Sequence, residues 1–230
     1  MNRLTWHGHS CFTLQTASGY RLMFDPWLNE NPAADIKTDD VDKLDFVLCS
    51  HGHYDHFGDA VTLCRKTGAT LLGAFELVAF AQSKGVQNAH SLHIGGGYNF
   101  PFGYAKMTPA MHGGQVAGDE AGTYTTHAGG WWLDLGQAGG RLYHAGDTAL
   151  LIEMQLLQGK VDVALLPIGD NYTMGPEDAV RAVEFIAPRT VIPMHYNTFD
   201  LIKQDPHAFA RRVGERAKVH VLEPGQSYEF

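Results

Sequence analysis

The chain is poor in cysteine. Its 230 residues include only Cys11, Cys49 and Cys64, and no two of these form a Cys-x-x-Cys pair. An odd number of widely spaced cysteines excludes a disulfide framework and a cysteine-rich zinc site. This scarcity favours a protein that works in a reducing compartment.

Positive charge is scarce as well. The sequence carries 17 Lys and Arg against 25 Asp and Glu, which gives a formal net charge of −8 at pH 7. An acidic surface argues against partners with negatively charged surfaces, such as nucleic-acid backbones and anionic membranes. We therefore expect a small-molecule partner and no nucleic-acid partner.

Long apolar runs are absent. The most apolar stretch, residues 161–168, is interrupted by Asp162 and is far shorter than the ~20 residues that span a bilayer. The first residues lack the apolar run of a signal peptide. These absences predict a cytoplasmic protein that makes no membrane contact.

The composition that remains suits a protein with a packed core, at 44% hydrophobic and 18% charged residues. The length and the lack of a linker predict a single domain over residues 1–230. Short strands fill the first half, and helices alternate with strands after residue 149. Helices are expected over residues 58–66, 75–84, 149–158, 176–186 and 206–216, a glycine turn at 95–97, and a last strand at 219–222. Two β-rich halves flanked by helices predict an α/β fold, a four-layer αββα sandwich.

Histidine is abundant, with 13 residues, and four chemistry-bearing side chains gather at His51, His53, Asp55 and His56. They follow an apolar strand expected over residues 44–50, and ligand sites of α/β proteins form at such carboxyl ends. Imidazole and carboxylate groups together suit zinc, iron or manganese. An extended turn would direct His51 and His53 to one ion and Asp55 and His56 to a neighbouring ion. The alternative is a polar surface turn without ligands.

This His-x-His-x-Asp-His pattern resembles the signature of the metallo-β-lactamase superfamily. The resemblance implies three further ligands in a set order, and the chain supplies them as His112, Asp147 and His195. Three further motifs narrow the resemblance to a small uncharacterised group of metal-dependent hydrolases. They are Gly-His-Ser at 8–10, Phe-Asp-Pro at 24–26 and Met-Gly-Pro-Glu-Asp-Ala at 174–179. That group is akin to the ascorbate-6-phosphate lactonases.

The resemblance implies two divalent metal ions, with zinc the first expectation and manganese, iron or nickel as alternatives. The implied ligands are His51, His53 and His112 for one ion, Asp55, His56 and His195 for the other, and Asp147 as the bridge. Two such ions generate a bridging hydroxide at neutral pH, which would attack an ester, a lactone or a phosphodiester. Asp55 could in addition orient this hydroxide. Two ions, two carboxylates and one hydroxide leave a net positive site, so an anionic substrate is expected.

Four neighbouring residues have two interpretations each. Asp25 either supports the ligand loop by hydrogen bonds or only initiates a turn. His9 either lines the site or is a buried structural imidazole. Tyr196 and Asn197, which follow His195, either contact the substrate or donate a proton, or they only pack at the strand end. The glycine-rich segment 113–130 is either a loop that gates the substrate or a disordered connection.

Three other functions compete with the binuclear hydrolase. A nuclease or phosphodiesterase of the same fold is one, although the acidic charge and the absence of a basic run weigh against nucleic acid. A di-iron redox protein is another, but such proteins carry an acidic residue where this chain has His53. A binding module without catalysis would not need all of the ligands. The sequence does not determine the oligomeric state. Symmetric dimers are the commonest assembly of such enzymes, so a homo-oligomer stands as an alternative to a monomer.

Overall fold

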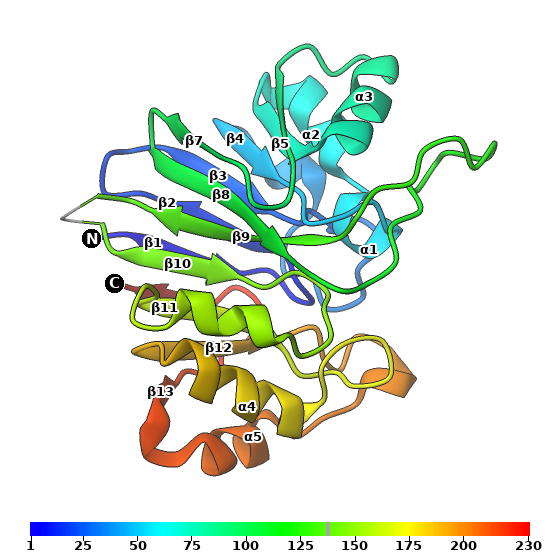
Figure 1. The fold of residues 1–230 in the computed structure, drawn as a ribbon. Helices are drawn as coiled ribbons and strands as arrows, with labels where there is room; N and C mark the ends of the chain where they lie inside the picture. Colours follow the sequence, from blue (N-terminus) through cyan, green and yellow to red (C-terminus); the bar gives the residue numbers. More distant parts are fainter. Residues whose placement is uncertain (137–138) are drawn as a thin grey trace.

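The architecture of the chain is two β-sheets packed face to face, with helices on both outer surfaces (Figure 1). The computed structural model describes residues 1–136 and 139–230. The predicted αββα sandwich is therefore confirmed within these residues. None of the helices in these two ranges is both long enough and apolar enough to cross a membrane.

The first sheet has the strand order β14-β1-β2-β3-β4-β5-β6. Its strands are β1 (Arg3–Trp6), β2 (Phe12–Gln15), β3 (Arg21–Phe24), β4 (Phe46–Leu48), β5 (Thr70–Ala74), β6 (Ala89–Leu92) and β14 (Ser227–Glu229). Strands β1 to β3 and β14 pair antiparallel, whereas β3 to β6 pair parallel. Parallel pairing aligns the carboxyl ends of β3, β4 and β5 at one edge of the sheet.

The second sheet has the strand order β13-β12-β11-β10-β9-β8-β7. Its strands are β7 (Gly97–Phe100), β8 (Gly103–Pro109), β9 (Gly129–Asp134), β10 (Arg141–His144), β11 (Val163–Pro167), β12 (Thr190–Met194) and β13 (Lys218–Val219). Strands β10 to β13 are parallel. Their carboxyl ends meet at the edge that carries the candidate site.

Helices cover the outer faces of the two sheets (Figure 1). They are α1 (Tyr54–Phe57), α2 (Ala60–Thr67), α3 (Phe75–Ser83), α4 (Pro176–Ile186) and α5 (Pro206–Val213). Short 3₁₀ turns occupy Thr38–Asp40, Ile152–Leu157, Asp200–Ile202 and Gly214–Arg216. Helix α4 begins and ends at the predicted residues because Pro176 occupies its first position and Ala187 closes it in a left-handed conformation.

Strand β4 explains why an uninterrupted apolar run precedes the histidine motif. Phe46 and Leu48 pack into the core between the two sheets, whereas Val47 packs into a second core beneath α2 and α3. Successive side chains of a strand point to opposite faces, so a strand covered on both faces is apolar at every position. Each buried leucine of this kind stabilises the fold by about 2 kcal/mol.

Several expected elements differ in the structure. The helix predicted at 149–158 is a 3₁₀ turn, because Ala149 donates its N–H to the carbonyl of Met111 instead of starting a helix, and only Met154 of the turn is buried. The turn at 95–97 leads directly into β7, and the last predicted strand, 219–222, is reduced to β13. The extended turn expected at 51–56 becomes helical at Tyr54, where α1 begins.

Candidate metal centre

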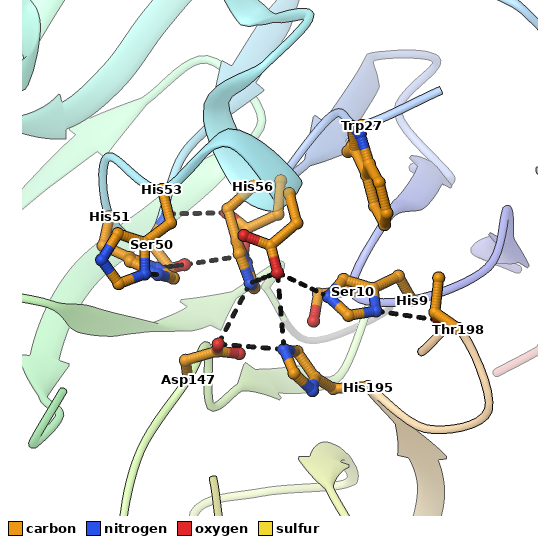
Figure 2. A network of polar contacts seen from close by, with 12 residues as sticks. His9, Ser10, Trp27, Ser50, His51, His53, His56, Asp147, His195 and Thr198 are labelled. Carbon is orange, nitrogen blue, oxygen red and sulfur yellow. Dashed lines mark hydrogen bonds and ion pairs between the residues drawn. The ribbon is translucent and has the colours of Figure 1, made fainter. Parts of the chain in front are cut away.

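The seven predicted ligands lie together at the carboxyl ends of four strands. Figure 2 labels five of them, His51, His53, His56, Asp147 and His195. His51 and His53 follow β4, and Asp55 and His56 lie on the helical turn α1 that comes next. The remaining three follow strands of the second sheet: His112 after β8, Asp147 after β10 and His195 after β12. The site therefore spans the seam between the two sheets, although its members are up to 144 positions apart in the sequence.

The first cluster consists of His51, His53 and His112. The Nδ1 atom of His53 lies 3.0 Å from Nε2 of His51 and 3.2 Å from Nε2 of His112. Ligand atoms around one tetrahedral zinc ion are separated by about 3.3 Å, because zinc–nitrogen bonds are ~2.0–2.1 Å long. Three imidazole nitrogens at this spacing fit the coordination shell of a single ion.

The second cluster surrounds His56 and His195. The carboxylate Oδ2 of Asp147 lies 3.2 Å from Nε2 of His56 and 3.0 Å from Nε2 of His195. The Oδ2 atom of Asp55 lies 3.8 Å and 3.9 Å from the same two nitrogens. Asp147 also approaches the first cluster, with Oδ2 at 3.6 Å from Nε2 of His112. Its carboxylate is thus the group that faces both clusters.

Hydrogen bonding to Asp25 fixes which ring nitrogen of His56 is free. The Nδ1 atom of His56 donates to Oδ2 of Asp25 over 2.7 Å, so a neutral His56 directs the lone pair of Nε2 at Asp147. A lone pair facing a carboxylate is repulsive unless a proton or a metal ion lies between them. Nε2 of His56, both ring nitrogens of His195 and Oδ1 of Asp147 are buried with no hydrogen-bond partner among the described residues. These orphaned atoms fit a metal site.

Asp25 supports the first cluster through Ser50. Its Oδ1 accepts from the Ser50 backbone N–H over 2.7 Å, and its Oδ2 accepts from the Ser50 hydroxyl over 2.6 Å. The Ser50 oxygen lies 3.0 Å from Nδ1 of His51 and can accept from it, which leaves Nε2 of His51 free for the first cluster. One buried carboxylate thus orients an imidazole in each cluster. The supporting interpretation of Asp25 agrees with these contacts.

The charges of the cluster are strongly coupled. Burial lowers the pKa of His51 well below its ordinary value. Burial also opposes a charged His56, but Asp147, Asp55 and Asp25 outweigh it and raise the pKa of His56. Likewise, burial favours a neutral Asp147, but His195 and His56 outweigh it and hold the pKa of Asp147 well below its usual range. The structure therefore keeps the Asp147 carboxylate ionised where a cation would bind.

His9 is completely buried beside Asp55. Its Nε2 lies 3.0 Å from Oδ2 of Asp55, and its Nδ1 lies 2.9 Å from the hydroxyl of Thr198. Burial, reinforced by His195, lowers the pKa of His9 to about 3, so the ring is neutral and donates one hydrogen bond. Figure 2 shows this ring between Thr198 and the cluster. The structure thus brings His9 to the site through Asp55.

Left-handed backbone conformations are concentrated at this edge. His9, Asp25 and His195 have φ angles of 55°, 42° and 55°, a conformation that is costly for residues other than glycine. Such strain persists where the surrounding structure enforces it, and it is typical of functional sites. At these positions the chain turns sharply at a strand end and directs each side chain into the cluster.

Tyr196 and Asn197 do not line the pocket above the cluster. The ring of Tyr196 stacks on Trp6 at a centroid distance of 5.6 Å, and Asn197 accepts a hydrogen bond from the backbone of Gln204. These contacts agree with the packing interpretation of both residues, and the substrate interpretation stays a prediction.

Three aromatic residues that were not predicted line this pocket instead. The pocket has a volume of about 470 Å³, and Tyr54, Tyr172 and Phe199 lie around the metal-ligand set. Tyr54 lies within the histidine motif, and its place in the sequence beside the predicted ligands was the only feature that could have indicated its position. Phe199 carried no signal, because nothing in the sequence places the segment after His195 over the cluster.

The segment 113–130 is anchored to the ligand loop at its base. Val116 is buried against Gly52, and the backbone N–H of Ala117 donates to the carbonyl of Gly52 over 2.7 Å. Beyond this base the segment projects from the molecule between β8 and β9 (Figure 1). The base of the segment therefore supports the ligand loop. The residues of the segment do not line the described pocket, and a gating role stays a prediction.

Among the residues that the structure describes, neither the cysteines nor a second depression of the surface provides a set of catalytic side chains. Burial raises the pKa of all three cysteine thiols, that of Cys64 to about 12, and thiols that remain protonated are poor nucleophiles. A larger, open depression of about 1640 Å³ lies at the opposite ends of β10 to β12 and is lined by residues such as Arg141, Asp162 and Arg189. The described residues there form no metal-ligand cluster.

Comparisons with known proteins agree with this geometry. A family model described as a beta-lactamase superfamily domain matches residues 3–195. A UPF0173 metal-dependent hydrolase of Bacillus cereus is 46% identical over 229 residues, and another from Bacillus thuringiensis subsp. konkukian is 45% identical over 229 residues; each match covers 98% of both chains. Among solved structures, the metallo hydrolase Igni18 of Ignicoccus hospitalis is 35% identical with a TM-score of 0.88, covering 100% of this chain and 99% of that one.

Proposed function

Because the chain belongs to the beta-lactamase superfamily and is a metal-dependent hydrolase by its relatives, we propose that it cleaves a small ester, lactone or phosphodiester with the help of two divalent ions. The observation that carries this proposal is the pair of adjoining clusters, His51–His53–His112 and Asp55–His56–His195 with His9 beside it, and the Asp147 carboxylate that approaches both. Residues 1–230 would act together as one hydrolase domain, because the ligands come from both sheets.

The residues divide into ligands and supports. His51, His53 and His112 would hold one ion, Asp55, His56 and His195 the other, and Asp147 both. When bound, two such ions would supply an activated water nucleophile at neutral pH and polarise the oxygen of the substrate. Zinc is the first choice for this mixture of imidazole and carboxylate, with manganese, iron or nickel as alternatives.

Asp55 has a second role in this proposal. Its carboxylate lines the pocket, and the pKa of Asp55 lies below its usual range because His56 and His9 outweigh the effect of burial. An ionised carboxylate at this position would accept a proton from the attacking water at one oxygen. His9 would keep the other oxygen in place by donating from Nε2.

The charge of the substrate would be met at the metal end of the pocket. The described lining includes no Lys or Arg, so an anionic group of the substrate would depend on the two ions for its counter-charge. The negative charge that the sequence analysis expects on the substrate would therefore lie on the reacting group, next to the ions, and not on the rest of the substrate.

A metal-reconstituted activity screen tests the proposal. The purified protein, loaded in turn with zinc, manganese, iron or nickel, is assayed against lactones, carboxylic esters, thioesters and phosphodiesters, beside the Asp147→Asn variant. Altering a residue that merely supports a ligand costs ~10–100-fold, so loss of the bridging carboxylate should lower kcat/KM by more than about 100-fold. Activity that survives Asp147→Asn unchanged would overturn the assignment.

A further inference from the structure

The wall of the pocket above the metal-ligand set is aromatic. Tyr54 comes from α1, Tyr172 from the loop between β11 and α4, and Phe199 from the segment after β12. Tyr54 and Tyr172 are each 50% exposed although both are large aromatic residues. Three rings from three separate segments thus converge over one polar site.

Trp27 holds two of these rings in place. It is almost fully buried, and its ring lies 5.6 Å from that of Tyr54 at an interplanar angle of 90° and 5.7 Å from that of Phe199. Phe199 also contacts His9 edge-on at 5.5 Å. The Trp27–Tyr54 and His9–Phe199 pairs are edge-to-face, and the Trp27–Phe199 pair is tilted at 34°. Aromatic pairs at these distances are attractive. Tyr54 and Phe199 are therefore fixed parts of a preformed wall.

Tyr172 lies on a loop that closes on itself. Asp170 donates its N–H to the carbonyl of Met174 over 3.1 Å and accepts from Thr173 over 3.2 Å. Asp170 and Asn171 have left-handed φ angles of 62° and 50°. A turn held by these bonds keeps Tyr172 on the pocket side and reduces the entropy lost when a ligand binds.

The pocket offers no charged partner to the part of a substrate that lies away from the ligands. All charged or imidazole groups of its described lining belong to the metal-ligand set, namely His53, Asp55, His112, Asp147 and His195. The volume of about 470 Å³ is in the range of small-molecule sites. A charged substituent among the three rings would lose its hydration without gaining a counter-ion.

From these observations we propose that the substrate carries an uncharged aromatic body, about the size of one ring, which packs among Tyr54, Tyr172 and Phe199 while its ester or lactone group faces the metal-ligand set. This proposal rests on the proposed hydrolase function and narrows its substrate class. Any negative charge would have to lie at the metal end.

Methyl esters that differ only in the acid body test this proposal in the metal-loaded enzyme. Methyl phenylacetate has an aromatic body, methyl acetate has none, and monomethyl succinate has an anionic one. Contacts with several aromatic rings favour the aromatic ester by about tenfold or more, so its kcat/KM should exceed that of both others by this factor. Tyr172→Ala and Phe199→Ala should each raise KM for methyl phenylacetate about fivefold with a smaller effect on kcat. The matched control is Tyr98→Ala, which removes a ring that is 52% exposed on β7 and should change neither constant.

Binding without turnover separates this proposal from the hydrolase function. Phenylacetamide and acetamide are titrated into metal-free and metal-loaded protein, and binding is followed by NMR line broadening of the probe. The proposal expects phenylacetamide to bind more tightly than acetamide and to lose affinity in Tyr172→Ala. If this result holds while neither these esters nor any substrate of the metal-reconstituted screen is cleaved, the pocket assignment stands and the hydrolase proposal fails. If monomethyl succinate is the preferred ester and phenylacetamide does not bind, the aromatic body is disproved and the hydrolase proposal stands.

Discussion

Among single residues, Asp25 influences the largest part of the site without being one of the seven predicted ligands. Its carboxylate is fully buried and has three partners, the Ser50 backbone, the Ser50 hydroxyl and Nδ1 of His56. Through these bonds it selects the free nitrogen of His56 directly and that of His51 through Ser50. Such outer partners of metal-binding histidines set both the tautomer and the ring orientation.

Replacing Asp25 by asparagine should therefore weaken metal binding. An amide keeps the size of the carboxylate but offers only one acceptor oxygen to its three donors, so His56 and Ser50 lose their fixed orientation. We expect metal affinity to fall by ~10–100-fold, measured by competition with a chromophoric chelator. Asp39→Asn, at an exposed carboxylate, should leave the affinity unchanged. An Asp25→Asn variant that retains full affinity would contradict the role assigned to Asp25.

At the scale of elements, the ligand loop between β4 and α1 depends on its contact with the segment 113–130. Gly52 separates the ligands His51 and His53, and a Cβ atom at this position would lie 2.8 Å from the Cα atom of Val116. A backbone atom cannot rotate away as the end of a side chain can. The absence of a side chain at Gly52 thus lets two segments pack closely enough to hold the histidines in register.

Gly52→Ala should consequently destabilise the fold and displace the ligands together. Overpacking of this kind costs ~1–3 kcal/mol, which urea denaturation would measure as a lower midpoint, and metal content after purification should fall in parallel. Gly122→Asn serves as the control, because Gly122 lies on the same segment with a φ of 63° and nothing within 4 Å of an added Cβ, and asparagine tolerates this conformation. If Gly52→Ala kept wild-type stability and metal content, the two segments would have adapted to the added methyl group, and the role assigned to Gly52 would be wrong.

At the scale of the whole molecule, the site joins the two sheets. His51, His53, Asp55 and His56 belong to the half of the chain that forms the first sheet, whereas His112, Asp147 and His195 belong to the second. Burial of the Asp55 and Asp147 carboxylates and the repulsion between these two like charges oppose this arrangement when no cation is bound. Ions held between the sheets would stabilise the entire sandwich.

Metal removal should therefore lower the thermal stability of the whole chain. An ion at about 1,000 times its Kd stabilises a protein by about 4 kcal/mol, which for a chain of this size raises Tm by about 10 °C. Differential scanning fluorimetry after chelation, and after stepwise addition of zinc or manganese, would measure this shift. Asp147→Asn should show a smaller increase on metal addition. Equal Tm values for the chelated and loaded protein would argue against a metal site between the sheets.

The sequence by itself determined the features that depend on local pattern. The doubly buried strand β4, the capped helix Pro176–Ile186 and the His-x-His-x-Asp-His spacing each follow from apolar periodicity, end-capping residues and the short range of a turn. From these, the αββα sandwich and the ligands His51, His53, Asp55 and His56 could be predicted. The other three ligands, His112, Asp147 and His195, were implied by the resemblance to the metallo-β-lactamase superfamily, and the structure brings all seven together.

Only the tertiary structure decided what depends on contacts between distant segments. It placed His9 against Asp55, 46 positions away, and directed Tyr196 toward Trp6 instead of the pocket. It also converted the helix expected at 149–158 into a 3₁₀ turn and brought Tyr172 and Phe199 over the ligands. The physical reason is that these positions are set by left-handed turns at strand ends and by aromatic packing between loops, and neither leaves a periodic pattern in the sequence.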